Sequence, residues 1–243
     1  MDPWIALSSP LTSQTVEYVA NTLRIMCAIS WNISYMSMAY YSFRDKTYGN
    51  ALIPLCNNIA WEFVYSFIHC PKLTFVRIEN TGWFLLNIVV MYAAIKYSEN
   101  EWKHAPLVQR NLPFIFAVGI SAMIAGHLAL AAQIGPRIAF VWSAKGCQLV
   151  LSTGALSQLL SRGSTRGGSY VVWLSRYLGT VFIDVMVTIR HVYRAAGPSW
   201  PSSPLLLWFM AVFHLLDWTY GFCFYHIRRQ ELVSEAAEKD KDK

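Results

Sequence analysis

Residues 51–69 read ALIPLCNNIAWEFVYSFIH, and this run of 19 residues contains one fully charged side chain, Glu62, just past its middle. As a helix, the run would be about 28 Å long, close to the thickness of the hydrocarbon core of a bilayer. Glu62 would then lie deep in the membrane. Because a charged carboxylate is costly there, we expect Glu62 to face the protein interior and to be paired or protonated.

Three further side chains share the helix face of Glu62, namely Asn58, Tyr65 and His69, which lie four residues before it and three and seven after it. The run is therefore an apolar helix with one polar stripe. A structural role, in which Glu62 is hydrogen-bonded to a neighbouring helix, is one interpretation. The other is a functional site, which is the default hypothesis for an ionisable group in a membrane span.

The composition is that of an integral membrane protein, with 55% hydrophobic and 14% charged residues and a mean hydropathy of +0.33. The five cysteines are odd in number and lack any CxxC spacing, so neither a disulfide framework nor a zinc site is predicted. The net charge of +6 would suit nucleic acid. However, the basic residues lie between apolar runs without a known motif, so no nucleic-acid partner is predicted.

The chain contains seven apolar runs long enough to cross a bilayer, at 18–40, 51–69, 81–98, 112–134, 138–161, 169–190 and 204–226. We predict an all-α polytopic membrane protein with seven transmembrane helices. Residues 1–243 would form a single membrane-embedded domain with a charged, disordered tail at about 228–243, which would begin as a frayed helix. The tight connection at Gly135 and Pro136 predicts an antiparallel hairpin of the fourth and fifth spans.

The basic residues that flank the runs predict the orientation. Twelve Lys and Arg residues lie on the side of the C-terminus and five on the other side, so the C-terminus should be cytosolic and the N-terminus lumenal. The last five residues, KDKDK, resemble a dilysine retrieval signal, although a solvated lysine-rich tail explains them equally well. We therefore expect a multi-pass protein of the endoplasmic reticulum.

Other ionisable residues also fall inside the runs: Arg24, His127, Lys145, Arg176, Asp184, His214 and Asp217. Lys145 and Asp184 lie at similar depths near the lumenal ends of the fifth and sixth runs, so they are predicted to pair. Arg176 and Asp184 belong to one polar stripe, which favours a helix that turns this face inward.

Asp217 lies close to the predicted depth of Glu62, so two carboxyl groups share the membrane midplane. His214 precedes Asp217 by three residues and could hydrogen-bond it or hold it charged. Trp61 adjoins Glu62 and Trp218 adjoins Asp217, and aromatic faces attract cations most strongly where water is absent. An aromatic belt that faces lipid is the structural alternative.

Glu62 and Asp217 are the candidate catalytic residues. Glu62 is the preferred proton donor, because its neighbours Asn58 and Tyr65 are neutral, whereas His214 lies one turn from Asp217 and favours its ionised form. The candidate substrate-binding residues are polar and aromatic neighbours of the two acids: Asn58, Trp61, Tyr65, His214, Trp218 and Tyr220. The chain contains neither DDxxD, an aspartate-rich motif that binds magnesium and diphosphate, nor DxDD, an aspartate-rich motif for protonation. No metal and no cofactor are therefore predicted. Amide substitutions at the two acids are expected to leave membrane insertion intact and to remove the proton.

Residues 42–65, SFRDKTYGNALIPLCNNIAWEFVY, and the DW pair at 217–218 resemble the fungal integral-membrane terpene cyclases of meroterpenoid and indole-diterpene pathways. The seven runs and the chain length are also similar to that family. Its catalytic acids, a glutamate in span two and an aspartate in span seven, match Glu62 and Asp217.

The resemblance implies a lipophilic epoxidised prenyl substrate, supplied by an upstream prenyltransferase and epoxidase of the pathway. The acid would open the terminal epoxide, and a carbocation cascade would close rings. We expect a farnesylated aromatic polyketide as the substrate, with an epoxygeranylgeranyl-indole as the alternative.

A seven-helix proton-coupled transporter or receptor is a different class of function, since buried acids and histidines also suit proton relays. A retinal-type receptor would want a lysine in the last run, and 204–226 contains none. Transporters often show repeat symmetry, which is not visible in the sequence. A membrane scaffold without chemistry fits poorly with two carboxyl groups at one depth.

Overall fold

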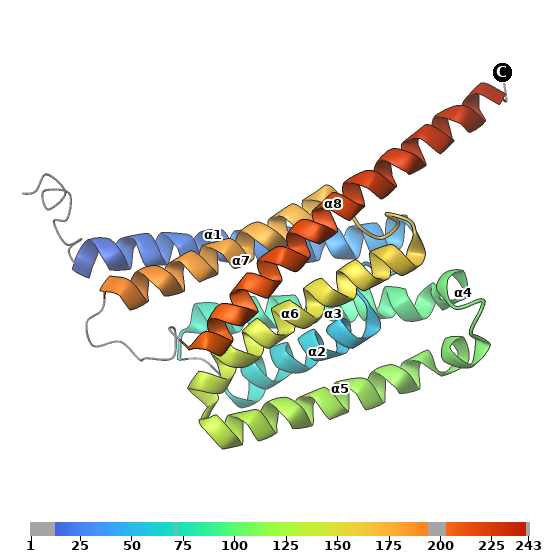
Figure 1. Ribbon diagram of the computed structural model, residues 1–243. Coiled ribbons are helices and arrows are strands. Elements are labelled where there is room, and N and C mark those ends of the chain that lie inside the picture. Colours follow the sequence, from blue (N-terminus) through green and yellow to red (C-terminus); the bar gives the residue numbers. More distant parts are fainter. Residues whose placement is uncertain (1–12, 71, 194–202, 242–243) are drawn as a thin grey trace, which may run out of the picture.

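The computed structural model describes residues 13–70, 72–193 and 203–241, which form helices and no strand (Figure 1). The helices in this part of the chain are α1 Ser13–Arg44, α2 Leu52–Phe63, the π-helix η2 Val64–Ile68, α3 Thr74–Lys96, α4 Ser98–Glu101, α5 Pro106–Ile134, α6 Pro136–Arg162, α7 Tyr170–Tyr193 and α8 Pro204–Lys241. The predicted all-α class is confirmed. Each of the seven apolar runs coincides with helical structure, and the four-residue α4 is an addition that the sequence analysis did not predict.

The bundle exposes apolar side chains and buries polar ones within its apolar core. Among the described helices, α3, α5, α7 and α8 are long and apolar enough to cross a membrane. Large exposed apolar side chains occur on several helices, among them Ile29, Leu85, Phe114 and Leu215. Buried polar side chains include Glu62, Asn87, Lys145, Arg176 and Asp217. This distribution suits a protein surrounded by lipid, because polar groups in the hydrocarbon region must find partners inside the protein.

Helix α2 lies inside the bundle and contacts α3, α5 and α6. Residues 54–62 are all buried, so this helix has no lipid-facing stripe. Directly after it, η2 closes with a hydrogen bond of 2.8 Å from the amide of His69 to the carbonyl of Val64. Such π-helical turns are frequent at functional sites, and this one begins two residues after Glu62.

Two long contacts organise the other helices. Figure 1 shows α1 (blue) and α7 (orange) side by side, and α8 (red) across α6 (yellow-green), in agreement with their residue contacts. Gly179 of α7 permits the close approach to α1, because a Cβ there would lie 2.6 Å from Cδ1 of Trp31. Small residues serve this purpose at helix contacts in membranes.

The predicted hairpin of the fourth and fifth spans is confirmed. Helix α5 ends at Ile134 and α6 begins at Pro136, and the two helices contact each other. Gly135 between them has a φ of 84°, a conformation that favours glycine. Pro136 fits the first position of α6, where its missing N–H leaves no bond unmade.

The C-terminal segment differs from the sequence prediction. The charged tail, predicted to fray from about residue 228 and to end in disorder, is helical as far as Lys241, because α8 continues beyond the bundle (Figure 1). Ion pairs of Arg228 with Glu231 and Glu235, at 3.1 and 3.4 Å, support this extension.

Some sequence predictions lie outside the described residues. Most of the connection predicted at 197–204 is not described. The same holds for Arg194, one of the basic residues used to predict the orientation, and for the last two residues of the KDKDK tail.

Candidate active site

Glu62 is held in the interior by side chains from two other helices. It is 1% exposed. The hydroxyl of Tyr35, on α1, donates to Oε1 at 2.7 Å. Nδ2 of Asn87, on α3, lies 2.8 Å from Oε1 and 2.9 Å from Oε2. Three helices therefore fix the carboxyl group in position.

The surroundings of Glu62 are aromatic and uncharged. The ring of Tyr35 stacks on Trp83 with the ring centroids 5.8 Å apart, and Trp31 packs against both rings. In the described part of the chain, no Lys, Arg or His forms an ion pair with Glu62. Since a buried charge without a counter-ion is costly, this environment favours the protonated carboxylic acid.

Asp217 has the opposite environment. It is 0% exposed, and its Oδ1 forms an ion pair with Nη2 of Arg176, which is itself buried. The guanidinium group of Arg176 also lies over the ring of Tyr220, 5.4 Å from the centroid. Nε1 of Trp173 donates to the backbone carbonyl of Asp217 at 2.9 Å. A facing guanidinium favours the carboxylate form of Asp217.

Arg176 changes an expectation from the sequence. With His214 as its visible neighbour, Asp217→Asn was expected to leave membrane insertion intact. In the structure His214 lies 3.4 Å from Oδ2 of Asp184, and Arg176 pairs with Asp217. An asparagine at 217 would leave a buried guanidinium without its counter-ion, so the substitution is now expected to destabilise the protein.

The predicted pair of Lys145 and Asp184 is confirmed. Nζ of Lys145 forms an ion pair with Oδ1 of Asp184, and both side chains are buried. Nζ also donates to Oε1 of Gln148 at 3.2 Å. The polar faces of α6 and α7 therefore meet inside the bundle, as their stripes predict.

Breaking this pair is expected to reduce the yield of folded protein. Asp184→Leu should leave the buried charge of Lys145 without a counter-ion, which costs about 3–5 kcal/mol, and Lys145→Met should leave Asp184 with only His214, whereas the double variant removes both charges. The measurement is the amount of monodisperse protein extracted from membranes. Recovery in the double variant is expected, and a yield below that of both single variants would contradict the pairing.

The predicted substrate-binding residues on α2 and η2 are all in the interior of the bundle. Trp61 and Tyr65 are buried and pack with Phe140, and Nε1 of Trp61 donates to Oγ of Ser143 at 2.9 Å. Asn58 is buried on the same helix.

The predicted residues of α8 divide between interior and surface. Tyr220 lies inside, against Arg176. Trp218 is 66% exposed and donates to the hydroxyl of Tyr177 at 2.6 Å, so it does not line the interior beside Asp217. Glu62 and Asp217 have no hydrogen-bond partner in common among the described contacts. Their sharing of one cavity stays a prediction.

The sequence patterns do not reveal the partners that define both acids, Tyr35, Asn87 and Arg176. Asn87 carried a usable signal, since it is a single amide in the apolar stretch WFLLNIVVMY. Arg176 belongs to the predicted inward stripe of its helix, but that stripe does not indicate which residue it pairs with. Among the described residues, no group of three or more His, Cys, Asp and Glu side chains is placed to hold a metal ion.

Comparisons with known proteins cover almost the whole chain. The family of Pyr4-like transmembrane terpene cyclases matches residues 4–230. The chain is 46% identical to the terpene cyclase penB of Penicillium crustosum over 243 residues, which is all of both chains. It is 48% identical to the terpene cyclase andB of Emericella variicolor, over 95% of this chain and 96% of that one. It is 43% identical to the terpene cyclase paxB of Penicillium paxilli, over 95% of each chain.

No solved structure matches the chain. The transmembrane description of the matched family agrees with the helical bundle and its apolar exterior. The chain belongs to the Pyr4-like transmembrane terpene cyclases.

Proposed function

We propose that this protein protonates the terminal epoxide of a prenylated substrate, a farnesylated aromatic polyketide, and guides the carbocation cyclisation that follows. The observation that carries this proposal is the contrast between the two buried acids. Glu62 has neutral hydrogen-bond partners, whereas Asp217 faces Arg176. One acid is thus suited to give up a proton and the other to stay negative.

In the proposed reaction, Glu62 gives its proton to the epoxide oxygen as the carbon–oxygen bond breaks. A half-turn of the Asn87 amide would place Oδ1, which has no partner among the described residues, where it can accept a hydrogen bond from the neutral acid. After transfer, Nδ2 of Asn87 and the hydroxyl of Tyr35 can donate to the carboxylate, as in the structure. The Asn87 amide therefore suits both protonation states.

The positive charge then moves along the prenyl chain of the substrate as its double bonds attack and rings close. The aromatic rings around Tyr35, including Trp31 and Trp83, can stabilise this charge through their faces. Asp217 supplies a fixed negative charge, held by Arg176. Its Oδ2 has no partner among the described residues, so it can accept the proton whose loss ends the cascade.

We propose seven membrane crossings in the endoplasmic reticulum, with a lumenal N-terminus and a cytosolic C-terminus. The asymmetry of Lys and Arg supports this orientation, and the helices at all seven apolar runs support the count. In sealed microsomes, protease added outside should remove a tag at the C-terminus. A tag that stays protected until detergent is added would contradict the orientation.

The function is tested by incubating microsomes that contain the protein with two synthetic substrates. We expect the epoxyfarnesylated aromatic polyketide to be cyclised, and equally well in the presence of EDTA. Cyclisation of an epoxygeranylgeranyl-indole alone would assign the alternative substrate. If neither compound is converted by correctly inserted protein, the proposed function is wrong.

A further inference from the structure

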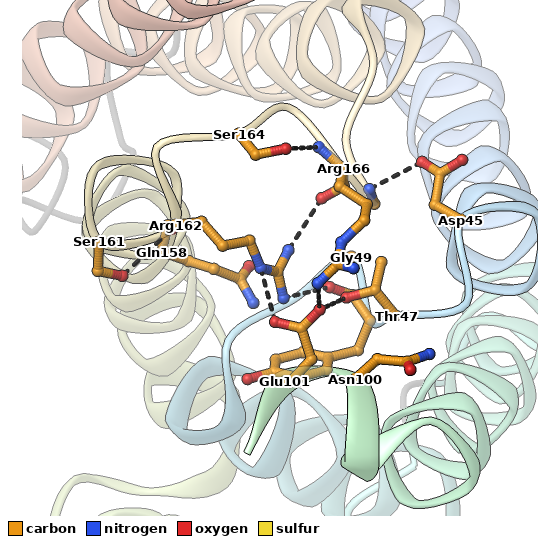
Figure 2. Close-up of polar contacts among 12 residues, drawn as sticks. Asp45, Thr47, Gly49, Asn100, Glu101, Gln158, Ser161, Arg162, Ser164 and Arg166 are labelled. Atoms are coloured by element: carbon orange, nitrogen blue, oxygen red, sulfur yellow. Dashed lines mark hydrogen bonds and ion pairs between the residues drawn. The ribbon is translucent and has the colours of Figure 1, made fainter. Parts of the chain in front are cut away.

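The loop between α6 and α7, residues 163–169, is held by carboxyl groups from three separate parts of the chain. They are Asp45 at the end of α1, Glu101 of α4 and Glu231 in the extension of α8. Figure 2 shows Asp45 and Glu101 on two sides of the loop. We call this segment the α6–α7 loop.

Glu101 binds two arginines, Arg162 directly before the loop and Arg166 within it. Its Oε2 accepts from Nε of Arg162 at 3.0 Å, and its Oε1 accepts from Nη2 of Arg166. Nη1 of Arg162 in turn donates to the carbonyl of Arg166 at 2.9 Å, as Figure 2 shows. The side chain of Glu101 is 7% exposed and that of Arg166 is 39% exposed, so the carboxylate is sheltered while one of its two arginine partners reaches the surface.

Glu231 and Asp45 bind the loop backbone. Oε1 of Glu231 accepts from the amide of Thr165 at 2.7 Å and from Oγ of Ser164 at 2.9 Å, while Oε2 accepts from Oγ1 of Thr165. Burial alone would raise the pKa of Glu231, but the hydrogen bonds from Thr165, Ser164 and Arg228 outweigh it and lower the pKa. Oδ2 of Asp45 accepts from the amide of Gly167 at 2.9 Å.

Residues of the loop line two neighbouring hollows. Its outer side lines a hollow of about 680 Å³, together with the end of α1, the start of α7 and the extension of α8. Its inner side lines a cavity of about 20 Å³ that reaches Gln158, Arg176 and Tyr220. This inner cavity has room for about one water molecule. Arg176, the partner of Asp217, lines the small cavity and not the large hollow, whereas loop residues such as Thr165 line both.

Two polar atoms of the inner cavity residues lack partners. Nε of Arg176 and Nε2 of Gln158 are buried without a hydrogen-bond partner among the described residues. More water in this cavity would find donors ready to hold it and would lie beside the ion pair of Asp217. Excluding further water from this cavity would therefore require the loop to stay closed.

We propose that the α6–α7 loop seals the Asp217 side of the active site against water, and that Glu101 and Glu231 are positioning residues that determine how the cation ends. The proposal rests on the proposed function. When the loop is closed, the cation loses a proton after ring closure. When it is open, a water oxygen bonds to the cationic carbon and releases one proton to solvent, which leaves an alcohol.

The test compares Glu101→Gln and Glu231→Gln with the matched control Glu235→Gln, at equal amounts of membrane-inserted protein. Glu235 lines the outer hollow, but its described ion pair is with Arg228 and not with the loop. The first measurement is hydroxyl-radical labelling of Tyr220, which is 7% exposed, relative to Tyr65, which is 0% exposed and lies elsewhere. The second is the fraction of product that carries ¹⁸O from labelled water.

We expect both loop variants to raise labelling of Tyr220 at least threefold and to raise the ¹⁸O-alcohol fraction severalfold, while Glu235→Gln matches the wild type in both. Unchanged labelling of Tyr220 in both loop variants overturns the seal, whatever the activity. Increased labelling with an unchanged alcohol fraction overturns the role in product choice. If the wild type cyclises no epoxide, the proposed function fails, and the labelling still decides whether the loop is a seal.

Discussion

Replacing Glu62 by glutamine should lower the rate of product formation by about 10²–10⁴-fold, the usual contribution of a general acid. Glutamine has nearly the same shape, and its Oε1 can still accept the 2.7 Å hydrogen bond from Tyr35. The protein should therefore fold and enter the membrane normally. What it loses is an acidic proton at this position. The measurement is product by mass spectrometry at matched amounts of membrane-inserted protein.

The matched control is Glu79→Gln. Glu79 lies on the neighbouring α3 and has no hydrogen bond to Glu62 among the described contacts. It should keep turnover close to that of the wild type. If Glu62→Gln also keeps near-normal turnover with unchanged products, Glu62 is not the acid and the mechanism must be abandoned.

Separating Arg176 from Asp217 should have the largest effect on stability. Either single substitution, Arg176→Gln or Asp217→Asn, leaves one charge buried without a partner, which costs about 3–5 kcal/mol. The double variant replaces both charges by neutral amides that can hydrogen-bond each other. It should recover most of the stability without recovering activity, because the fixed negative charge beside the cation is gone.

Thermal unfolding in detergent measures the stability of these variants, and turnover at matched protein amounts measures their activity. Near wild-type melting temperatures in both single variants would contradict the ion pair. Full activity in the double variant would show that the negative charge of Asp217 is not needed.

Much of the fold follows from the sequence alone. Apolar runs of about 20 residues place the helices, because length and hydropathy decide which segments can lie in a bilayer. The turn at Gly135 and Pro136 is predictable because glycine permits a positive φ and proline fixes its own φ at the start of a helix. The pair of Lys145 and Asp184 was predictable because both residues are costly alone and lie at matching depths.

The partners of the two acids were harder to predict. Tyr35 and Asn87 lie 27 and 25 residues from Glu62, and Arg176 lies 41 residues from Asp217. Which helices become neighbours depends on packing throughout the bundle, and periodicity within one helix does not contain that information.

Trp218 shows a second limit of sequence reasoning. Adjacent residues on a helix point about 100° apart, so a neighbour of a buried acid need not share its face. On α8, which is partly exposed, this difference places Trp218 on the outside. Trp61, the neighbour of Glu62, stays buried because α2 is enclosed by other helices.

The most direct test of the central claim is to offer wild-type membranes one prenylated aromatic substrate in two forms, with and without the terminal epoxide. An epoxide opens on protonation far more readily than an unactivated alkene accepts a proton, so a single buried carboxylic acid suffices for the epoxide. We predict that the epoxide is cyclised and the alkene is recovered unchanged. Cyclisation of the alkene at a comparable rate would contradict the proposed mechanism.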